Sequence, residues 1–257
     1  ISESKSATQW VENESYRKLE PNSLPNKLIA KVDFLKGSLN NSLNPSEKGK
    51  MKRQHSSKQF PKIVDGYSGK GIKLDGDAWL DLDRIGVFKR NHTFSIGIRI
   101  YIPEELENGV IFHKNMGTRL YNYRGFHLVL KDNKLEAMLA HFWPDNAIVE
   151  LSHERIPKDK WLQLTMTYDG SSKAKGLKIY LDGEELKTNI EVDNLYKDII
   201  YKIDKEPGLQ IGARWRGKGI GGAVVDDILV FTRELTALEV IQISDTKRFQ
   251  RIINKSA

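Results

Sequence analysis

The fold is decided by residues 161–186, which read WLQLTMTYDGSSKAKGLKIYLDGEEL. Large apolar side chains take every second position over residues 162–168 and again over residues 177–181. This period of two is typical of strands that bury one face. Asp169-Gly170 and Asp182-Gly183 follow the two runs, and Asp-Gly is a dipeptide that tight turns favour. The segment therefore predicts an antiparallel hairpin.

The same alternation continues on both sides of this hairpin. Apolar residues take every second position in FSIGIRIYIP (94–103) and in GFHLVLK (125–131). Further strands are expected from LIAKVDF (28–34), GLQIGA (208–213) and GAVVDDILVF (222–231). About ten to twelve strands with one apolar face, and no alternation of strands with helices, predict an all-β chain. The expected architecture is an antiparallel two-sheet jelly-roll sandwich.

Two segments interrupt or close this β pattern. Residues 36–62 are rich in Ser, Asn, Lys and Gly and predict a long loop. Thr236 and Glu239 have the spacing of a capping box, which predicts a short helix near the end of the chain. The basic stretch from Lys247 to Lys255 can continue as a further helix.

The chain is therefore expected to divide into three parts. Residues 1–27 are polar and predict an N-terminal arm, part of it helical, with Trp10 docked on the sandwich. Residues 28–245 make the jelly roll, and residues 246–257 make a basic C-terminal extension. Because the chain opens at Ile1, we expect a processed product or a fragment of a larger protein.

Composition excludes several functional classes. Hydrophobic residues make up 39% of the 257 positions and charged residues 29%, as in ordinary globular proteins. No apolar run approaches the roughly 20 residues of a membrane helix, so we predict no membrane insertion. The absence of cysteine excludes disulfides, thiolate nucleophiles, iron–sulfur clusters and haem attachment within this chain.

The net charge of +7 raises the question of a nucleic-acid partner. Basic residues concentrate at 48–62 and 247–255, where they could neutralise phosphates. No nucleic-acid-binding motif accompanies them, and lysine-rich runs are commonly solvated. We therefore predict no nucleic-acid partner.

Three segments of the chain resemble laminin-G-like jelly rolls of the concanavalin A type. KGIKLDGDAWLDL (70–82), FSIGIRIYIP and GVIFHK (109–114) resemble the opening strands of these domains. Their central hairpin resembles residues 161–186, and their closing strand and helix resemble GGAVVDDILVFTRELTALEV (221–240). The resemblance extends over residues 28–245 and implies the same fold.

A narrower resemblance concerns one branch of these domains. Three segments of the chain are similar to this branch: YRGFHLVL (123–130), HFWPDNAI (141–148) and GARWRGKGIGG (212–222). Modules of this branch are embedded in large proteins of Planctomycetes and Bacteroidetes that carry cytochrome c-like and uncharacterised flanking domains. The resemblance implies a non-catalytic binding module of a bacterial multidomain protein, located in the periplasm or at the cell surface.

Aromatic and basic side chains occur together in loops that flank the expected strands. They are Tyr123, Arg124, His141, Trp143, Asn146, Arg214, Trp215 and Arg216. Sugars present an apolar C–H face and a rim of hydroxyl groups, so a sugar site combines stacking rings with planar donors and acceptors. If these loops converge, the predicted ligand is a neutral or acidic carbohydrate.

The alternative is that these side chains only pack within their loops. The chain would then be a structural module that contacts neighbouring domains of the same parent chain and binds no glycan. Trp79 and Trp161 begin strands and are assigned to packing in either case.

A glycoside hydrolase or lyase on the same fold is the lesser alternative. A retaining glycosidase needs two carboxyl groups about 5 Å apart. Laminarinase-like enzymes place Glu-x-Asp-x-x-Glu on one strand, and neither Asp81-Leu-Asp83 nor Glu191-Val-Asp193 has a third acid in register. We therefore predict no catalytic residue.

Asp226 is the one residue for which the sequence suggests a metal ion. A carboxylate on a late strand could hold calcium, while Asp227 should point to the opposite face of that strand. The alternative is that Asp226 accepts hydrogen bonds from a nearby turn or pairs with Arg233. Because residues 35–45 lack an Asp-rich loop, we favour this second role and predict no cofactor, with calcium as the alternative. The six histidines do not show the spacing of a zinc site.

Overall fold

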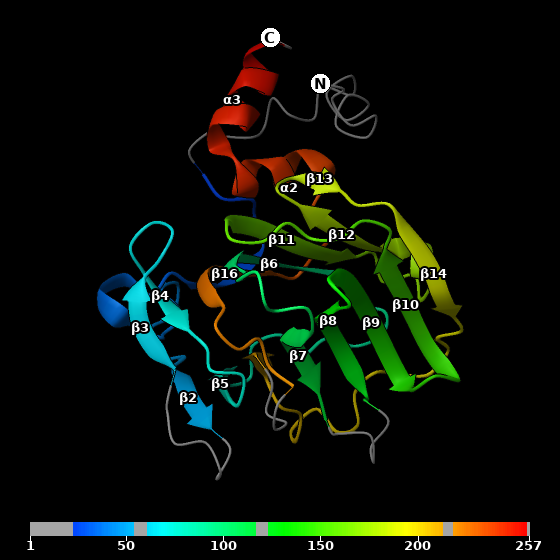
Figure 1. Ribbon diagram of the computed structural model, residues 1–257. Coiled ribbons are helices and arrows are strands. Elements are labelled where there is room, and N and C mark those ends of the chain that lie inside the picture. Colours follow the sequence, from blue (N-terminus) through cyan, green and yellow to red (C-terminus); the bar gives the residue numbers. More distant parts are fainter. Residues whose placement is uncertain (1–22, 54–60, 117–122, 213–217, 256–257) are drawn as a thin grey trace.

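The computed structural model describes residues 23–53, 61–116, 123–212 and 218–255. Two eight-stranded antiparallel sheets, here called A and B, form the two layers of a sandwich (Figure 1). The jelly-roll architecture expected from the sequence is confirmed. The predicted helix and docking contact of the N-terminal arm lie outside the described residues.

Sheet A contains the central hairpin. Its strands lie in the order β13 (Glu184–Glu185), β12 (Leu177–Leu181), β11 (Trp161–Tyr168), β6 (Phe94–Tyr101), β16 (Val224–Phe231), β4 (Lys70–Lys73) and β3 (Lys62–Asp65), and β1 (Leu28–Val32) also pairs with β16. β11 and β12 pair from Tyr168 opposite Leu177 to Leu164 opposite Leu181. The predicted hairpin is therefore confirmed, with the short 3-10 turn η4 (Ala174–Gly176) in its connection.

Sheet B is the other layer. Its strands lie in the order β14 (Thr188–Asp193), β10 (Asn146–Ser152), β9 (Lys134–Phe142), β8 (Gly125–Lys131), β7 (Gly109–Asn115), β15 (Leu209–Ile211), β5 (Ala78–Leu82) and β2 (Gly49–Arg53). Because β14 lies at one edge and β15 lies five strands away, the connection 194–208 must pass the ends of four intervening strands. This connection carries residues of the candidate functional site that is described below.

The hydrophobic core lies between the two sheets. Ile96, Ile98 and Ile100 of β6 are fully buried on one side, and Phe126 and Leu128 of β8 are fully buried on the other. These residues are the apolar positions of the two alternating patterns, so periodicity identified the inward faces. Truncating one such side chain to alanine typically costs about 2–5 kcal/mol.

The expected loop over residues 36–62 is wrong in part. β2 lies within it and pairs with β5. The short 3-10 turn η2 (Leu35–Gly37) lies at the start of the segment. β2 is an edge strand whose lysines face outward, and edge strands commonly carry lysine because it discourages pairing with other chains. Its composition therefore resembled that of a loop.

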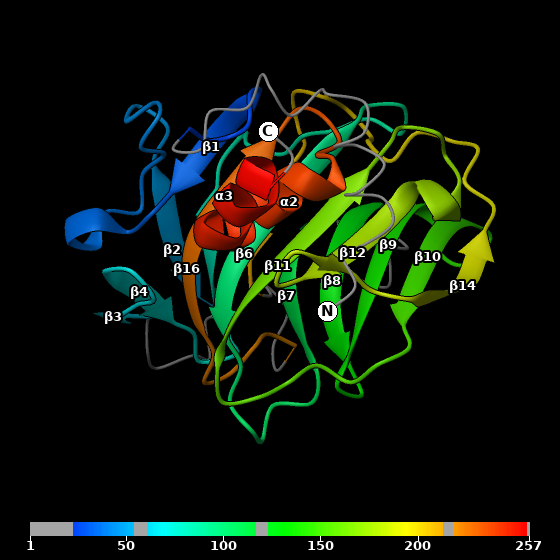
Figure 2. The ribbon, with the colours of Figure 1, turned by 90° about the horizontal axis from the view of Figure 1, so that it is seen from above.

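Two helices cover the outer face of sheet A (Figure 2). α2 (Ala237–Ser244) begins with the predicted capping box, in which the Glu239 N–H donates to Thr236 Oγ1 at 3.3 Å. α3 (Thr246–Lys255) follows and packs Phe249 and Ile253 against α2. The basic stretch near the C-terminus is thus helical, and one of its faces is buried.

Candidate functional site

Several residues singled out in the sequence meet at one end of sheet B, where β9 ends and where β8 and β10 begin. Tyr123 and Trp143 pack there on an apolar patch that is separate from the main core. The patch consists of Met138, Ala140, Ala147, Val149 and Val192. Two aromatic side chains therefore lie against one surface of the sheet.

Arg124 is held at the same end of sheet B by His141. The Arg124 Nε–H donates to the His141 carbonyl at 3.2 Å, and Arg124 Nη2 lies 3.1 Å from His141 Nε2. His141 Nδ1 lies 2.5 Å from the carbonyl oxygen of Asp198, so Nδ1 carries the proton and the bare Nε2 accepts from the guanidinium. Both ring nitrogens of His141 are thus engaged. This histidine positions Arg124 rather than facing a ligand.

Asn146 fixes the beginning of the connection 194–208. Its side chain is 3% exposed, and its Oδ1 accepts the N–H groups of Tyr196 at 3.1 Å and Lys197 at 3.2 Å. A buried carbonyl that accepts two backbone donors has little capacity for a ligand. Asn146 is therefore a positioning residue.

A buried ion pair fixes the far part of the same connection. Lys114 on β7 pairs with Glu206, and neither side chain is exposed to solvent. Glu206 Oε1 also accepts the N–H groups of Tyr201 and Lys202. Burial lowers the pKa of Lys114, and Glu206 opposes that effect. The connection is thus held from the interior of the sandwich.

The anchored connection presents aromatic side chains to solvent. Tyr196 is 59% exposed and Tyr201 is 62% exposed, and Phe142 at the end of β9 is 42% exposed. The Arg124 guanidinium carbon lies 5.5 Å from the centroid of the Tyr201 ring. We call Tyr123, Arg124, Phe142, Trp143, Tyr196 and Tyr201 the aromatic rim.

The structure brings together five of the eight residues proposed from the sequence. Of these, Tyr123, Arg124 and Trp143 belong to the aromatic rim, whereas His141 and Asn146 support it. Arg214, Trp215 and Arg216 lie outside the described residues. Tyr196 and Tyr201 were missed, although each is followed by lysine within a connection that lacks strand periodicity.

A polar row crosses the outer face of sheet B. Asp81, Gln210, His113 and His127 are successive cross-strand neighbours on β5, β15, β7 and β8. Trp79 lies two residues before Asp81 and is half-buried, with its indole nitrogen making no hydrogen bond within the described part of the chain. The assignment of Trp79 to packing implied a place in the sandwich core. Trp79 instead lies on the outer face of sheet B.

Asp81 within this row and Glu136 beside it are carboxylates, and each pairs with a lysine. Lys52 Nζ lies 2.6 Å from Asp81, and Lys131 Nζ lies 2.5 Å from Glu136, which also lies 3.3 Å from His127. Burial disfavours the charge of Glu136, but His127 and Lys131 outweigh it and lower its pKa to about 2.

Asp226 accepts hydrogen bonds from a turn, as one of the two alternatives supposed. Its Oδ2 lies 2.9 Å from the N–H nitrogen of Tyr67 and 3.2 Å from that of Ser68. A bulge in β16 with φ of 43° at Asp227 also turns the second carboxylate towards Ser68, at 3.4 Å. The expectation that the two carboxylates point to opposite faces is therefore wrong.

Arg233 does not pair with Asp226. Its guanidinium binds both carboxylate oxygens of Glu239, with Nη1–Oε2 at 2.7 Å and Nη2–Oε1 at 2.5 Å. Within the described ranges, no three His, Cys, Asp or Glu side chains are grouped so that they could hold a metal ion. The same ranges contain no helix that is long and apolar enough to span a membrane.

These features define a jelly-roll β-sandwich with a solvent-exposed aromatic surface at one end. The family model described as the concanavalin A-like lectin/glucanases superfamily matches residues 74–241, more than half of the chain. The chain belongs to this superfamily. No curated protein matches it in sequence.

Solved structures with the same fold include binding domains. Domain 4 of AbnA, a GH43 extracellular arabinanase from Geobacillus stearothermophilus in complex with arabinotriose, has a TM-score of 0.59 at 18% identity, over 85% of this chain and 98% of that one. The binding domain of Paraclostridial Mosquitocidal Protein 1 has a TM-score of 0.65 at 15% identity, over 86% of this chain and 52% of that one.

The receptor binding domain of botulinum neurotoxin D is a third such structure. Its TM-score is 0.58 at 14% identity, over 86% of this chain and 53% of that one. The chain thus spans about half the length of the two toxin domains. At these identities the likeness concerns the fold.

Proposed function

We propose that this chain is a non-catalytic carbohydrate-binding module whose ligand contacts the aromatic rim. The observation that carries the proposal is the connection 194–208, which exposes Tyr196 and Tyr201 while buried polar groups hold its backbone. An exposed tyrosine on a fixed backbone loses little conformational freedom when it stacks on a sugar. Such rigidity favours binding.

The charge of the rim suits a hydroxyl-rich or acidic glycan. Arg124 lies beside Tyr201, and Lys197 and Lys202 lie within about 6 Å of the rings of Tyr196 and Tyr201, respectively. Rings provide stacking surfaces for the C–H face of a sugar, and the cationic groups donate hydrogen bonds to hydroxyl or carboxylate oxygens.

The positions of two carboxylates on the outer face of sheet B, Asp81 and Glu136, agree with a non-catalytic role of that face. Asp81 on β5 and Glu136 on β9 are separated by four strand spacings of about 4.8 Å, or about 19 Å along the sheet. Retaining glycosidases need about 5 Å between their two carboxyl groups, and inverting ones about 6.5–9.5 Å. These two carboxylates are therefore too far apart to act as such a pair.

Glycan-array screening followed by calorimetry on the best ligand tests the proposal. We expect Tyr201→Ala and Arg124→Gln each to weaken binding about tenfold or more, with unchanged thermal unfolding. Tyr67→Ala is the matched control, because Tyr67 is 53% exposed and belongs to the turn beside β3 in sheet A. Binding that survives both rim substitutions would exclude this site.

A domain-interaction role is the second candidate, and Ile203 is the observation that favours it. Ile203 is 62% exposed on the same connection; its side chain offers no ring on which a sugar can stack, whereas a partner domain that covered it would bury apolar surface. The partner would be another domain of the parent chain. Ile203→Ser should leave glycan affinity unchanged and should weaken binding to an excised neighbouring domain if the second role is correct.

We also propose that the module belongs to a larger bacterial protein outside the cytoplasm. The resemblance to embedded laminin-G-like modules supports this, as does the fold shared with a domain of an extracellular arabinanase. Fractionation of cells that express the full-length parent, with detection by an antibody against this domain, tests it. Recovery in the cytoplasm would contradict it.

A further inference from the structure

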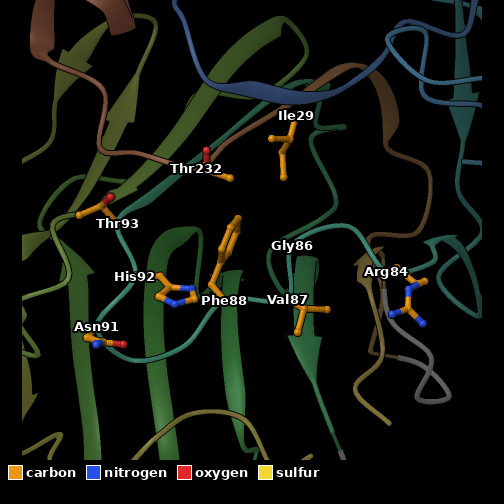
Figure 3. A pocket seen from close by; sticks show the side chains of 9 residues that line it. All are labelled: Ile29, Arg84, Gly86, Val87, Phe88, Asn91, His92, Thr93 and Thr232. Atoms are coloured by element: carbon orange, nitrogen blue, oxygen red, sulfur yellow. The ribbon is translucent and has the colours of Figure 1, made fainter. Parts of the chain in front are cut away.

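A pocket of about 450 Å³ shares no lining residue with the aromatic rim (Figure 3). It is bordered by β1, by the segment 83–93 that leads from β5 into β6, and by Thr232, which follows β16. Its volume falls in the range of about 300–1,000 Å³ typical of small-molecule sites.

The middle of the pocket is apolar. Phe88 stands there below Ile29 and Thr232, with Val87 beside it (Figure 3). The Phe88 ring is stacked on Phe94 with 4.5 Å between centroids, so its position is fixed by the core. Phe88 is itself only 5% exposed, so the half-buried Val87 and Ile29, which is 39% exposed, provide the apolar surface that is open to a ligand.

Polar groups lie at the two ends of this apolar surface. Asn91, His92 and Thr93 are at one end, and Arg84 is at the other (Figure 3). Among the described residues, the lining contains one permanent cation and no carboxylate. No hydrogen bond or ion pair within the described part of the chain engages the side chains of Arg84 and Asn91. These groups are therefore available to a ligand.

The polar end is held in place before any ligand arrives. The Tyr168 hydroxyl donates to the Arg90 carbonyl at 2.7 Å, and the Arg90 N–H donates to Asp198 Oδ1 at 3.0 Å. His92 Nδ1 accepts the Lys89 N–H at 3.3 Å, so in the neutral ring the proton is on Nε2. His92 therefore presents a hydrogen-bond donor.

We propose that this pocket binds a sugar acid, a short saccharide that carries a carboxylate. The carboxylate pairs with Arg84, whose planar guanidinium matches it with two parallel hydrogen bonds. The hydroxyl groups at the other end meet Asn91, His92 and Thr93, and the C–H face lies against Ile29 and Val87. This site is additional to the aromatic rim and shares no ligand-contacting residue with it, although Asp198 of the connection 194–208 supports both.

Titration of the ¹⁵N-labelled chain with digalacturonate tests the proposal by NMR. We expect amide shifts to change mainly at residues 84–93 and at Thr232, with weaker or no change when a neutral galactose disaccharide is added. Arg84→Gln should weaken digalacturonate binding about tenfold or more, because it removes a charge-assisted pair. Arg155→Gln is the matched control, since Arg155 is an exposed arginine in the connection between β10 and β11.

The outcomes separate this proposal from the proposed function. Shift changes at residues 84–93 that persist in Tyr201→Ala support a pocket independent of the aromatic rim. The proposal is overturned if digalacturonate leaves residues 84–93 unchanged, if the neutral disaccharide binds equally well, or if Arg84→Gln has no more effect than Arg155→Gln.

Discussion

Lys114 on β7 and Glu206 in the connection 194–208 form an ion pair that is completely removed from solvent. The same carboxylate accepts the backbone N–H groups of Tyr201 and Lys202. The interior of the sandwich thereby determines where Tyr201 stands on its surface. Buried charge is costly unless it is paired, so this arrangement links the stability of the fold to the geometry of the rim.

Lys114→Met should destabilise the chain by about 3–5 kcal/mol, because Glu206 is then left as an unpaired buried carboxylate. Urea unfolding at neutral pH measures the effect. The double variant Lys114→Met/Glu206→Gln should recover at least half of the loss, since glutamine still accepts the two N–H groups but carries no charge. A single variant that loses less than about 1 kcal/mol would show that the pair has no such role.

Asn146 provides a second prediction about the same connection. Asn146→Ala leaves the N–H groups of Tyr196 and Lys197 without their acceptor, which should cost about 1–3 kcal/mol and weaken glycan binding at the rim. Asn146→Asp retains an acceptor and should retain most of the binding. Asn189→Ala is the control, because the exposed Asn189 on β14 accepts from the exposed His153 and lies outside the connection 194–208. Calorimetry and unfolding together distinguish positioning from direct contact, since Asp would not replace an amide that donates to the ligand.

Much of the fold could be predicted because burial leaves a regular mark on the sequence. The alternation in β6 and β11, and the capping box at Thr236, correspond to elements that the structure contains. β2 was taken for part of a loop because an edge strand exposes both its lysines and one side of its backbone. The bulge at Asp227 was also missed, since a single left-handed residue does not disturb the apolar pattern around it.

The candidate site could be predicted only in part. Residue chemistry brought Tyr123, Arg124 and Trp143 to attention, and the topology of sheet B places them at one end. The separate roles of His141 and Asn146 depend on hydrogen bonds to residues about 50 positions away, which no local pattern encodes. Tyr196 and Tyr201 become candidates only when the path of the connection 194–208 is known.

Asp226 allows a test of calcium against a structural role. The carboxylate already accepts N–H groups from Tyr67 and Ser68, so Asp226→Ala should cost about 1–3 kcal/mol by leaving those donors unsatisfied. Adding calcium or the chelator EGTA should leave the melting temperature of the wild-type chain unchanged. A clear rise in melting temperature with calcium that Asp226→Ala abolishes would instead identify a calcium site.

Glu136 gives the stability of the chain a defined dependence on acid. Its pKa is about 2 in the folded chain against an ordinary value of 4.5, so its carboxylate stabilises the fold above about pH 4.5 and this contribution disappears as the pH falls towards 2. Over that range the wild-type chain should lose about 3 kcal/mol more than Glu136→Gln, which has no carboxylate to protonate.

Denaturant unfolding at a series of pH values between 2 and 5 measures this difference. Because Glu136→Gln changes only this carboxyl group and keeps both of its partners, the difference between the two profiles reports the carboxylate. Glu154→Gln is the control, because Glu154 is exposed in the connection between β10 and β11, away from the partners of Glu136. Parallel pH profiles for the wild-type chain and Glu136→Gln would mean that His127 and Lys131 do not hold this carboxylate in its charged form.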